Sequence, residues 1–216
     1  MATLPQRVGI LGGTFDPVHR GHVALALAAI QACRLRRVYF VPAPRPWHRE
    51  DARATDRASL PDRYAMLALA LADQPRCQPL YIPDRAGRPT YTMDQLDWMD
   101  ADGVSSERYL ILGADAFALL PSWKHYRRLL RRCHFIVAPR QGFDFPRAAA
   151  VVPRNLVRQQ QGCVLALAGG HQLHWLGGFR SPASASAARG GAEGQLPRAV
   201  ARYIRRAGLY QHAQDL

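Results

Sequence analysis

The chain has 216 residues, of which 48% are hydrophobic and 21% are charged, and its formal net charge is +13 at pH 7. This length suits one well-packed domain, so we expect a single domain over residues 1–216, with a short helical C-terminal part at about 182–210. The longest apolar stretch, Val23–Ile30, is too short to cross a bilayer, and residues 1–7 lack the charged head and apolar core of a signal peptide. These features argue against a membrane-spanning or secreted protein, and we expect a cytoplasmic protein without a membrane partner.

Charge and cysteine usage point to no dedicated partner. Lys124 is the only lysine, so the basic excess is almost all arginine, and the arginines are spread along the chain. We favour a solvated basic surface without a specific nucleic-acid partner, and non-specific adhesion to nucleic acids at low salt is the alternative. The cysteines Cys33, Cys77, Cys133 and Cys163 lack C-x-x-C spacing, so we expect reduced, partly buried thiols and no metal site.

An N-terminal segment combines a strand, a glycine turn and the start of a helix. Residues 9–22 read Gly-Ile-Leu-Gly-Gly-Thr-Phe-Asp-Pro-Val-His-Arg-Gly-His. We predict a buried strand over Val8–Leu11, a turn at Asp16-Pro17 and a helix over Gly21–Ala32. His19 and His22 then flank the helix start and can share one face.

This arrangement suits an anion. Gly12-Gly13 lets the backbone approach a ligand, and a helix N-terminus offers N–H groups and partial positive charge. Phosphoryl or nucleotidyl transfer needs mainly positioning and stabilisation of charge on phosphate oxygens, and imidazole can donate hydrogen bonds or carry positive charge. The structural alternative is a glycine turn before an ordinary helix with two capping histidines, and the combination of elements disfavours it. We therefore predict a nucleotidyl-transfer site with His19 and His22 at its centre.

Further along the chain, strand-like and helix-like segments alternate, which predicts an α/β fold with a parallel sheet and crossover helices. Strands are expected at Val38–Val41, Gln78–Ile82, Tyr109–Leu112, Phe135–Ala138, Val164–Ala168 and Gln172–Leu176. Helices are expected at Ser59–Ala72, Thr92–Asp100, about Arg147–Gln160 and Pro197–Ala207. Ser59 can cap the first of these helices, and Gly208 follows the last. Ser181–Gly194 is rich in small residues and is expected to form a loop or a short mobile helix.

Three later segments are candidates for ligand contacts. Pro42–Arg49 and Gly113–Asp115 each follow a predicted strand, where a doubly wound sheet places ligand loops. Thr90 or Thr92 can cap the helix that follows them. N–H groups at such a helix start favour a carboxylate over a neutral amide.

The segment Gly12–His19 with Gly21-His22 resembles the signature of the HxGH nucleotidyltransferase superfamily. More narrowly, it resembles the bacterial nicotinate-nucleotide adenylyltransferase family, which joins ATP to nicotinic acid mononucleotide and produces deamido-NAD and pyrophosphate in NAD biosynthesis. The resemblance implies a Rossmann-like, doubly wound parallel sheet of the HxGH type, with Mg²⁺ accompanying ATP as co-substrate. It implies catalysis by His19 and His22, and ATP contacts by Gly12, Gly13, Thr14, Phe15, His19 and His22.

Two middle segments resemble the family's loops. Trp47-His48-Arg49 stands where the family usually has Pro-His-Lys, which implies that Arg49 lies near the ATP phosphates and that His48 contacts the substrate. Pro89-Thr90-Tyr91-Thr92 resembles the family's Pro-Ser-Tyr-Thr stretch. That resemblance implies contacts with the nicotinate ring by Thr90, Tyr91 and Thr92.

A third segment, Leu112–Phe117, resembles the family's Gly-x-Asp element and is followed at the expected distance by Trp123. The resemblance implies that Gly113, Asp115 and Trp123 bind the acceptor nucleotide. Asp115 could accept hydrogen bonds from a ribose, and Trp123 could stack on a pyridine ring. Taken alone, Trp123 reads as a core residue.

The segment Ala183–Arg189 stands where the family has Ile-Ser-Ser/Ala-Thr-x-Ile-Arg, which implies that Ser184, Ser186 and Arg189 meet the ATP phosphates. Both isoleucine positions are alanine in this chain, and Gly190-Gly191 follows where the family continues a helix. The Arg-Pro-Gly that often follows the Phe135 strand is altered as well, to Pro-Arg-Gln-Gly.

Two alternatives stay open. One is another HxGH adenylyl- or cytidylyltransferase, such as phosphopantetheine adenylyltransferase, against which Tyr91, Asp115 and Trp123 argue. The other is a catalytically impaired, basic nucleic-acid-binding relative. The preference for acid over amide in the acceptor is open too, and a homo-oligomer is compatible with the sequence.

Overall fold

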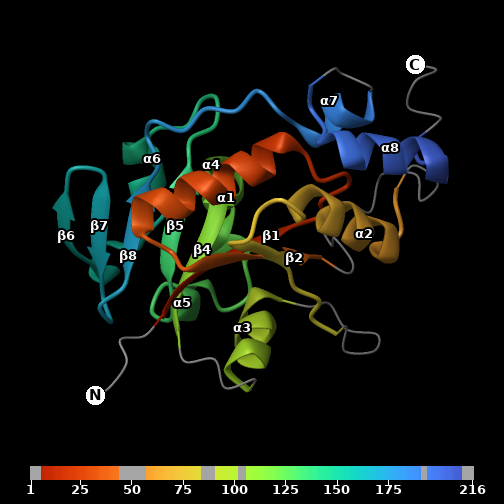
Figure 1. Ribbon diagram of the computed structural model, residues 1–216. Helices are drawn as coiled ribbons and strands as arrows, with labels where there is room; N and C mark the ends of the chain where they lie inside the picture. Colours follow the sequence, from red (N-terminus) through yellow and green to blue (C-terminus); the bar gives the residue numbers. More distant parts are fainter. Residues whose placement is uncertain (1–5, 44–56, 84–90, 102–105, 191–193, 211–216) are drawn as a thin grey trace. The chain divides into compact units, whose positions relative to one another are not determined.

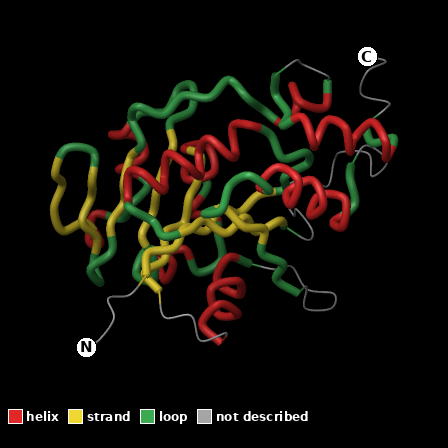
Figure 2. Tube along the Cα trace, in the orientation of Figure 1, coloured by secondary structure: helices red, strands yellow, loops and turns green. Residues whose placement is uncertain are grey.

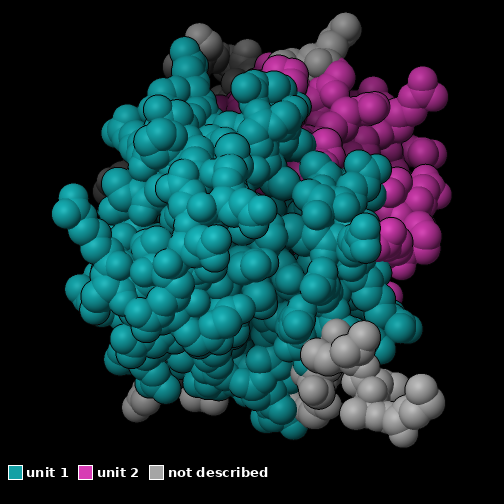
Figure 3. Space-filling model, turned by 90° about the vertical axis from the view of Figure 1, so that its left-hand side faces the viewer, with its two compact units in different colours: residues 1–11, 26–38, 91–180 teal, residues 12–25, 39–90, 181–216 magenta. Residues whose placement is uncertain are grey.

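The computed structural model describes residues 6–43, 57–83, 91–101, 106–190 and 194–210. The chain forms two compact units that alternate along the sequence and are coloured separately in Figure 3. Unit 1 comprises residues 1–11, 26–38 and 91–180, and unit 2 comprises residues 12–25, 39–90 and 181–216. A single domain over the whole chain stays a prediction.

Figure 1 labels the elements, and Figure 2 separates helices, strands and loops along the same trace. The strands are β1 (Gln6–Gly13), β2 (Arg37–Pro42), β3 (Cys77–Pro79), β4 (Ser106–Gly113), β5 (His134–Ala138), β6 (Val157–Gln161), β7 (Val164–Leu167) and β8 (Gln172–Trp175). The α-helices are α1 (Arg20–Cys33), α2 (Leu60–Leu71), α3 (Thr92–Ala101), α4 (Ala114–Ala118), α5 (Tyr126–Leu129), α6 (Phe145–Ala150), α7 (Ala185–Arg189) and α8 (Arg198–Ala207). Two 3-10 helices are η2 (Leu120–Ser122) and η3 (Arg154–Leu156). None of the described helices is long and apolar enough to cross a membrane.

The strands form an eight-stranded sheet in the order β3-β2-β1-β4-β5-β8-β7-β6. β4 pairs in parallel with β1 and β5, and β5 pairs in parallel with β8. The first five positions follow the strand order of a doubly wound sheet. The predicted α/β, Rossmann-like class is therefore confirmed.

The core of unit 1 is built on β4 and β5, whose apolar runs are buried on both faces, as expected for central parallel strands. The predicted strands Tyr109–Leu112 and Phe135–Ala138 are confirmed within them. Gly9 of β1 packs tightly beside β4, since a Cβ at this position would be 2.8 Å from the Ile111 side chain. Glycine at this position lets the neighbouring side chains close over the strand.

Ion pairs connect helix α3 to other elements of unit 1. Arg132 pairs with Asp97, with 2.5 Å between Nη1 and Oδ1, and also with Asp100. Asp100 also pairs with Arg108 of β4, whose side chain is 9% exposed. In Figure 1, α3 and α5 lie on one side of the sheet and α6 lies on the other.

The predicted helix around Arg147–Gln160 is wrong. The chain forms the short helix α6, in which Asp144 accepts the Arg147 N–H at 2.9 Å, and then enters η3 and strand β6. Pro153 lacks the N–H that a continuing helix would need. Gly162, with φ of +54°, instead turns β6 into an antiparallel pairing with β7. β7 is also antiparallel to β8, so antiparallel strands form the edge of the sheet that ends in β6.

In unit 2, α2 and α8 pack against each other (Figure 1). Ser59 caps α2 as predicted, since its Oγ accepts the Asp62 N–H at 3.2 Å. The Tyr203 hydroxyl of α8 donates to Asp62 at 2.8 Å, and Gly208 ends α8 with φ of +61°. Both predicted helices are confirmed, and α7 lies within the segment that was expected to be a loop or short helix.

Strand β3 is shorter than predicted. It ends at Pro79. One further bond joins Leu80 N–H to the Phe40 carbonyl at 2.8 Å. The N-terminal strand and the helix that follows it match their predicted positions closely.

The cysteines are free thiols, of which Cys33, Cys77 and Cys133 are buried and Cys163 is exposed. Burial raises the pKa of Cys33 and Cys77 to about 11 and that of Cys133 to about 12. The reactive thiolate is therefore strongly disfavoured at these three positions.

Candidate functional site

The candidate phosphate site in unit 2 begins where β1 ends. Among the described residues, nothing lies within 4 Å of the point where a Cβ on Gly12 would stand, whereas a Cβ on Gly13 would be 3.2 Å from the Phe15 ring. Phe15 has φ of +48°, and its ring is buried. That ring lies 5.6 Å from the Phe40 ring and 4.9 Å from the His22 ring between centroids. The turn is therefore anchored by Phe15 and stays open at Gly12.

His19 and His22 stack at the start of α1, with ring centroids 3.7 Å apart and planes inclined by 24°. The His19 backbone N–H donates to Nδ1 of His22 at 3.2 Å, and the His22 N–H donates to the His19 carbonyl at 3.0 Å. A side chain that accepts a hydrogen bond from the N–H three residues earlier resembles a capping box. The histidines therefore do cap the helix, which is the structural alternative considered from the sequence.

The capping bond also determines which ring nitrogen of neutral His22 carries the proton. Because Nδ1 accepts a hydrogen bond, the neutral ring carries its proton on Nε2, which makes Nε2–H a donor. His19 is 4% exposed and His22 is half-buried. Capping and phosphate binding are thus compatible, since they use different nitrogens of His22.

The segment before α7 lies against the start of α1. A Cβ on Gly21 would be 2.7 Å from Ser181 Oγ, 3.0 Å from His19 Nδ1 and 3.1 Å from Ala183 Cβ. Glycine at this position therefore permits the close approach of residues 181–183 to the histidines.

Helix α7 carries the three C-terminal residues predicted to meet ATP. Ser184 caps this helix, since its Oγ accepts the Ala187 N–H at 3.1 Å. Ser186 is exposed, and Nη1 of Arg189 donates to the carbonyl of Asp16 at 2.5 Å. Arg189 thus brings α7 into contact with the segment that holds His19 and His22.

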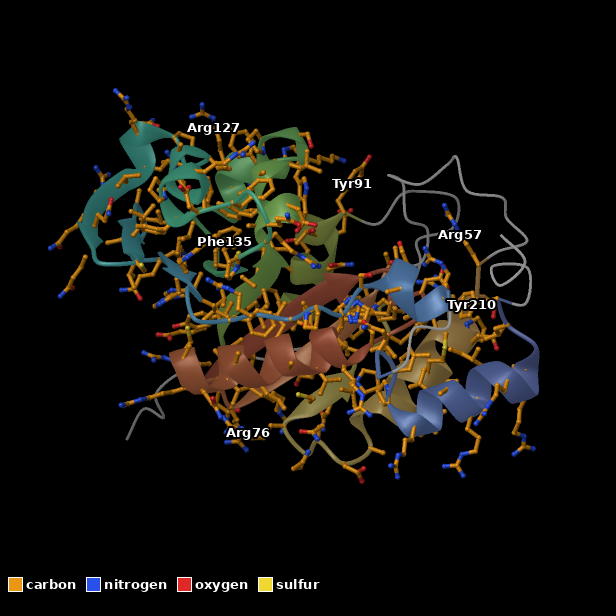
Figure 4. All side chains as sticks on the ribbon, turned by 90° about the horizontal axis from the view of Figure 1, so that it is seen from above. Arg57, Arg76, Tyr91, Arg127, Phe135 and Tyr210 are labelled. Atoms are coloured by element: carbon orange, nitrogen blue, oxygen red, sulfur yellow. The ribbon has the colours of Figure 1, made fainter. Side chains whose placement is uncertain are left out.

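Asp16 is itself buried, with 6% of its surface exposed. Its Oδ1 accepts the Tyr210 hydroxyl at 2.5 Å and the Ala58 N–H at 3.1 Å. Burial and the bond to Asp16 raise the pKa of Tyr210, so the phenol stays protonated and donates. Tyr210 is labelled in Figure 4.

Arg63 of α2 is 5% exposed and lies at the same turn. Its Nη1 donates to the carbonyls of Thr14 at 2.7 Å and Ala43 at 2.9 Å. Burial lowers the pKa of Arg63, and the charge of Asp16 acts in the opposite direction. The guanidinium is therefore a buried cation that binds backbone oxygens of two loops.

Sequence reasoning missed Arg63 and Tyr210. A signal for Arg63 exists, because it shares the buried face of α2 with Met66, Leu67 and Leu71. A cation in an apolar helical stripe indicates a buried partner. Tyr210 follows α8 and carries no comparable pattern.

Unit 1 holds the candidate acceptor residues. The Tyr91 N–H donates to Oδ2 of Asp94 at 3.1 Å, and α3 begins at Thr92, so Asp94 supplies the observed cap. The Lys124 ammonium lies 4.4 Å from the centroid of the Tyr91 ring (labelled in Figure 4), which brings the segment of half-buried Trp123 next to Tyr91.

Asp115 lies at the carboxyl end of β4, as expected for a ligand-binding position. Its carboxylate folds back over Gly113, where a Cβ would collide with Oδ1. Nε of Arg140 lies 3.8 Å from the same oxygen. The Asp115 side chain is 59% exposed, so it is accessible to a ligand.

The predicted site residues fall into two groups. Unit 2 contains Gly12, Gly13, Thr14, Phe15, His19, His22, Ser184, Ser186 and Arg189, and unit 1 contains Tyr91, Thr92, Gly113, Asp115 and Trp123. His48, Arg49 and Thr90 lie outside the described residues.

Sequence comparison with known proteins shows the family to which the chain belongs. A family model described as cytidylyltransferase-like matches residues 10–189. A probable nicotinate-nucleotide adenylyltransferase of Moorella thermoacetica is 36% identical over 223 aligned residues, which cover 100% of this chain and 96% of the relative. The corresponding protein of Gloeobacter violaceus is 34% identical over 95% of this chain and 96% of its own length.

A solved structure is similar in fold. Nicotinic acid mononucleotide adenylyltransferase of Plasmodium falciparum, complexed with NaAD, superposes with a TM-score of 0.72 at 17% identity. The match covers 95% of this chain and 97% of that structure. The chain therefore belongs to the nicotinate-nucleotide adenylyltransferase family within the cytidylyltransferase-like nucleotidyltransferases, enzymes of NAD biosynthesis that transfer an adenylyl group from ATP to nicotinic acid mononucleotide.

Proposed function

We propose that His19, His22 and the backbone of residues 12–15 hold the phosphates of ATP during this transfer. The observation that carries the proposal is the stacked histidine pair at the start of α1, in which Nδ1 of His22 is used for capping and Nε2–H is a donor. Gly12 adds an open position at the end of β1. These groups can stabilise charge that develops on the α-phosphate oxygens.

The proposed reaction is an in-line displacement. A phosphate oxygen of nicotinic acid mononucleotide attacks the α-phosphorus of ATP and forms a new P–O bond. The bond from that phosphorus to the oxygen bridging to the β-phosphate breaks, and pyrophosphate leaves with the electron pair. The attacking phosphate is already an anion, so neither a general base nor a covalent enzyme intermediate is needed.

Mg²⁺ would enter with ATP and neutralise negative charge on the triphosphate. Among the described residues, no group of three His, Cys, Asp or Glu side chains is placed to hold a metal ion. A cation held chiefly by phosphate oxygens and water suits that arrangement. The protein's part is then to position the phosphates through His19, His22 and the 12–15 backbone.

The acceptor nucleotide is proposed to bind Tyr91, Thr92, Gly113, Asp115 and Trp123. The exposed Asp115 carboxylate can accept hydrogen bonds from ribose hydroxyls, and the Tyr91 and Trp123 segments lie side by side. The Plasmodium falciparum neighbour is complexed with NaAD, which supports a pyridine nucleotide as the ligand class. Thr90 and His48 belong to the same proposal by resemblance.

The far side of the ATP site is proposed to include Ser184, Ser186 and Arg189, together with Arg49. A guanidinium has five N–H donors, so an arginine that binds one backbone carbonyl can still donate to a phosphate. The bond from Arg189 to Asp16 places this cation beside the histidine segment. This contact supports a phosphate-binding role despite the altered residues around it.

The test is pyrophosphate release from ATP and Mg²⁺ with nicotinic acid mononucleotide, nicotinamide mononucleotide and phosphopantetheine in parallel. We expect release with the first acceptor and a much lower kcat/KM with the others. Release with phosphopantetheine alone would identify a different adenylyltransferase. No release with any acceptor, together with salt-sensitive binding to DNA or RNA, would identify an impaired relative that binds nucleic acids. A cytoplasmic location without a specific nucleic-acid partner belongs to the same proposal.

A further inference from the structure

Three backbone carbonyls of residues 12–16, the segment called the phosphate turn below, accept hydrogen bonds from other parts of unit 2. The Gly13 carbonyl accepts the Ala43 N–H at 2.8 Å, and the Thr14 carbonyl accepts Nη1 of Arg63 at 2.7 Å. The Asp16 carbonyl accepts Nη1 of Arg189 at 2.5 Å. Free carbonyl oxygens near a phosphate would repel it, so the direction of each peptide group matters for an anion site.

These bonds determine where the amide groups point. In a trans peptide the C=O and the following N–H lie on opposite sides of the chain. The N–H of Thr14 is therefore turned away from Ala43, and the N–H of Phe15 is turned away from Arg63. The Thr14 N–H thus faces away from the residue that follows β2, and the Phe15 N–H faces away from the buried arginine.

The conformation of this turn needs such support. Phe15 adopts φ of +48°, a left-handed region that is strained for a residue with a side chain. Arg63 binds the carbonyl directly before Phe15, and the same Nη1 binds the carbonyl of Ala43, the first residue after β2. One buried cation therefore joins the two loops that follow β1 and β2.

The cation is supported in turn by Asp16 and Tyr210. The charge of Asp16 opposes the lowering of the Arg63 pKa by burial, and Tyr210 and Ala58 hold the Asp16 carboxylate in place. All of these groups are nine-tenths buried or more. Nothing in the proposed reaction requires Arg63, Asp16 or Tyr210 to touch a substrate.

We propose that Arg63 is a positioning residue for adenylyl transfer, which acts with Asp16 and Tyr210 to aim the Thr14 and Phe15 amide groups at the ATP phosphates. This inference rests on the proposed phosphate site. A positioning role differs from a purely stabilising role in what its loss changes. Loss of a stabilising residue lowers the amount of folded protein, whereas loss of a positioning residue turns the amide donors away from the phosphates and lowers the turnover of protein that is still folded. A misplacement of about 1 Å costs on the order of 100-fold in rate.

The experiment compares Arg63→Met with Arg108→Met, a second buried arginine that pairs with Asp100 in unit 1. Both variants lose a buried guanidinium, so both lower the thermal unfolding temperature. Turnover is measured well below that temperature, on protein shown to be folded by circular dichroism. We expect Arg63→Met to lower kcat by about 10- to 100-fold, with KM for nicotinic acid mononucleotide within about twofold of wild type. Arg108→Met is expected to keep kcat within about twofold.

Two milder variants keep the test decisive if Arg63→Met does not fold. Arg63→Lys keeps the charge but lacks the planar fork, so its kcat should fall between those of Arg63→Met and wild type. Tyr210→Phe leaves Arg63 in place and frees Asp16, so kcat should fall by about 3- to 10-fold. Wild-type kcat in every folded variant, or an equal loss of kcat in Arg108→Met, overturns the inference.

Calorimetric binding of Mg-ATP separates this inference from the proposed function. If wild type binds Mg-ATP but releases no pyrophosphate with any acceptor, the proposed function fails. The positioning role is then judged by affinity, since it predicts at least about fivefold weaker binding in Arg63→Met and wild-type binding in Arg108→Met. Equal binding in both variants overturns it, and failure of wild type to bind Mg-ATP overturns both proposals.

Discussion

The Tyr210 hydroxyl donates a 2.5 Å hydrogen bond to Oδ1 of Asp16, across 194 positions of sequence. The bond joins the end of the described chain to the turn that precedes His19 and His22, the residues proposed to hold the ATP phosphates. Hydrogen bonds to charged groups are worth about 1.5–3 kcal/mol, and a buried carboxylate loses most when one of its donors is removed.

We therefore predict that Tyr210→Phe lowers the free energy of unfolding by about 1.5–3 kcal/mol, measured by urea denaturation. The control is Tyr203→Phe, which removes a bond to the more exposed Asp62 and should cost less than about 1 kcal/mol. Equal losses in the two variants would contradict the prediction.

The two nitrogens of His22 can be tested separately. An Asn side chain can supply an acceptor near the position of Nδ1, and a Gln side chain can supply an N–H near the position of Nε2. We expect His22→Asn to keep the cap and the unfolding temperature but to lower kcat by about 100- to 1000-fold.

His22→Gln should show the opposite pattern, with a lower unfolding temperature and a kcat at least about tenfold above that of His22→Asn. Steady-state kinetics and thermal unfolding of both variants give the comparison. The assignment of Nε2–H as the phosphate donor is wrong if His22→Asn turns over as fast as His22→Gln.

Two glycines give contrasting predictions. Gly21→Ala should lower kcat although alanine favours a helix by about 1 kcal/mol, because its Cβ would displace Ser181 or His19. Gly12→Ala should leave the free energy of unfolding within about 0.5 kcal/mol of wild type, since its Cβ enters open space among the described residues.

If the ATP phosphates approach Gly12, the same Gly12→Ala variant should raise KM for ATP by about tenfold or more. An unchanged KM for ATP in a fully folded Gly12→Ala variant would remove this position from the proposed site.

Acid should destabilise the protein through His134. Burial, and then the neighbouring His171, lower the pKa of His134 to about 4, while Glu107 raises it and His174 and Arg7 lower it further. The unfolded chain binds this proton near pH 6.5, whereas the folded protein binds it only near pH 4. The contribution of neutral His134 to the free energy of unfolding is therefore fully present above pH 6.5 and is lost as the pH falls toward 4.

His134→Phe removes the titration and keeps a ring to stack on Tyr109, whose centroid is 4.3 Å away. Urea unfolding at pH 7, 6, 5 and 4.5 should therefore show a shallower loss of stability in the variant, by up to about 2–3 kcal/mol. Parallel pH profiles for wild type and variant would disprove the assignment.

Local signals in the sequence located most elements and half of the candidate site. The strand, glycine turn and helix around His19 and His22 follow from residues next to one another in the chain, so short-range rules find them. The same holds for the Ser59 cap of α2 and for Gly208 at the end of α8. The helix expected around Arg147–Gln160 failed because Pro153 interrupts it and because residues 157–161 pair with β7 instead.

The sequence by itself determined the fold class, and it predicted a phosphate-binding turn, since the conformational freedom of glycine, the donors of histidine and the N–H groups of a helix start depend on neighbouring residues only. Only the tertiary structure decided which groups support that turn. Arg63 reaches Thr14 across 49 positions, and Tyr210 reaches Asp16 across 194. Burial of a cation or a carboxylate is favourable only where folding brings hydrogen-bonding partners to it. No local sequence pattern predicts which residues those partners are.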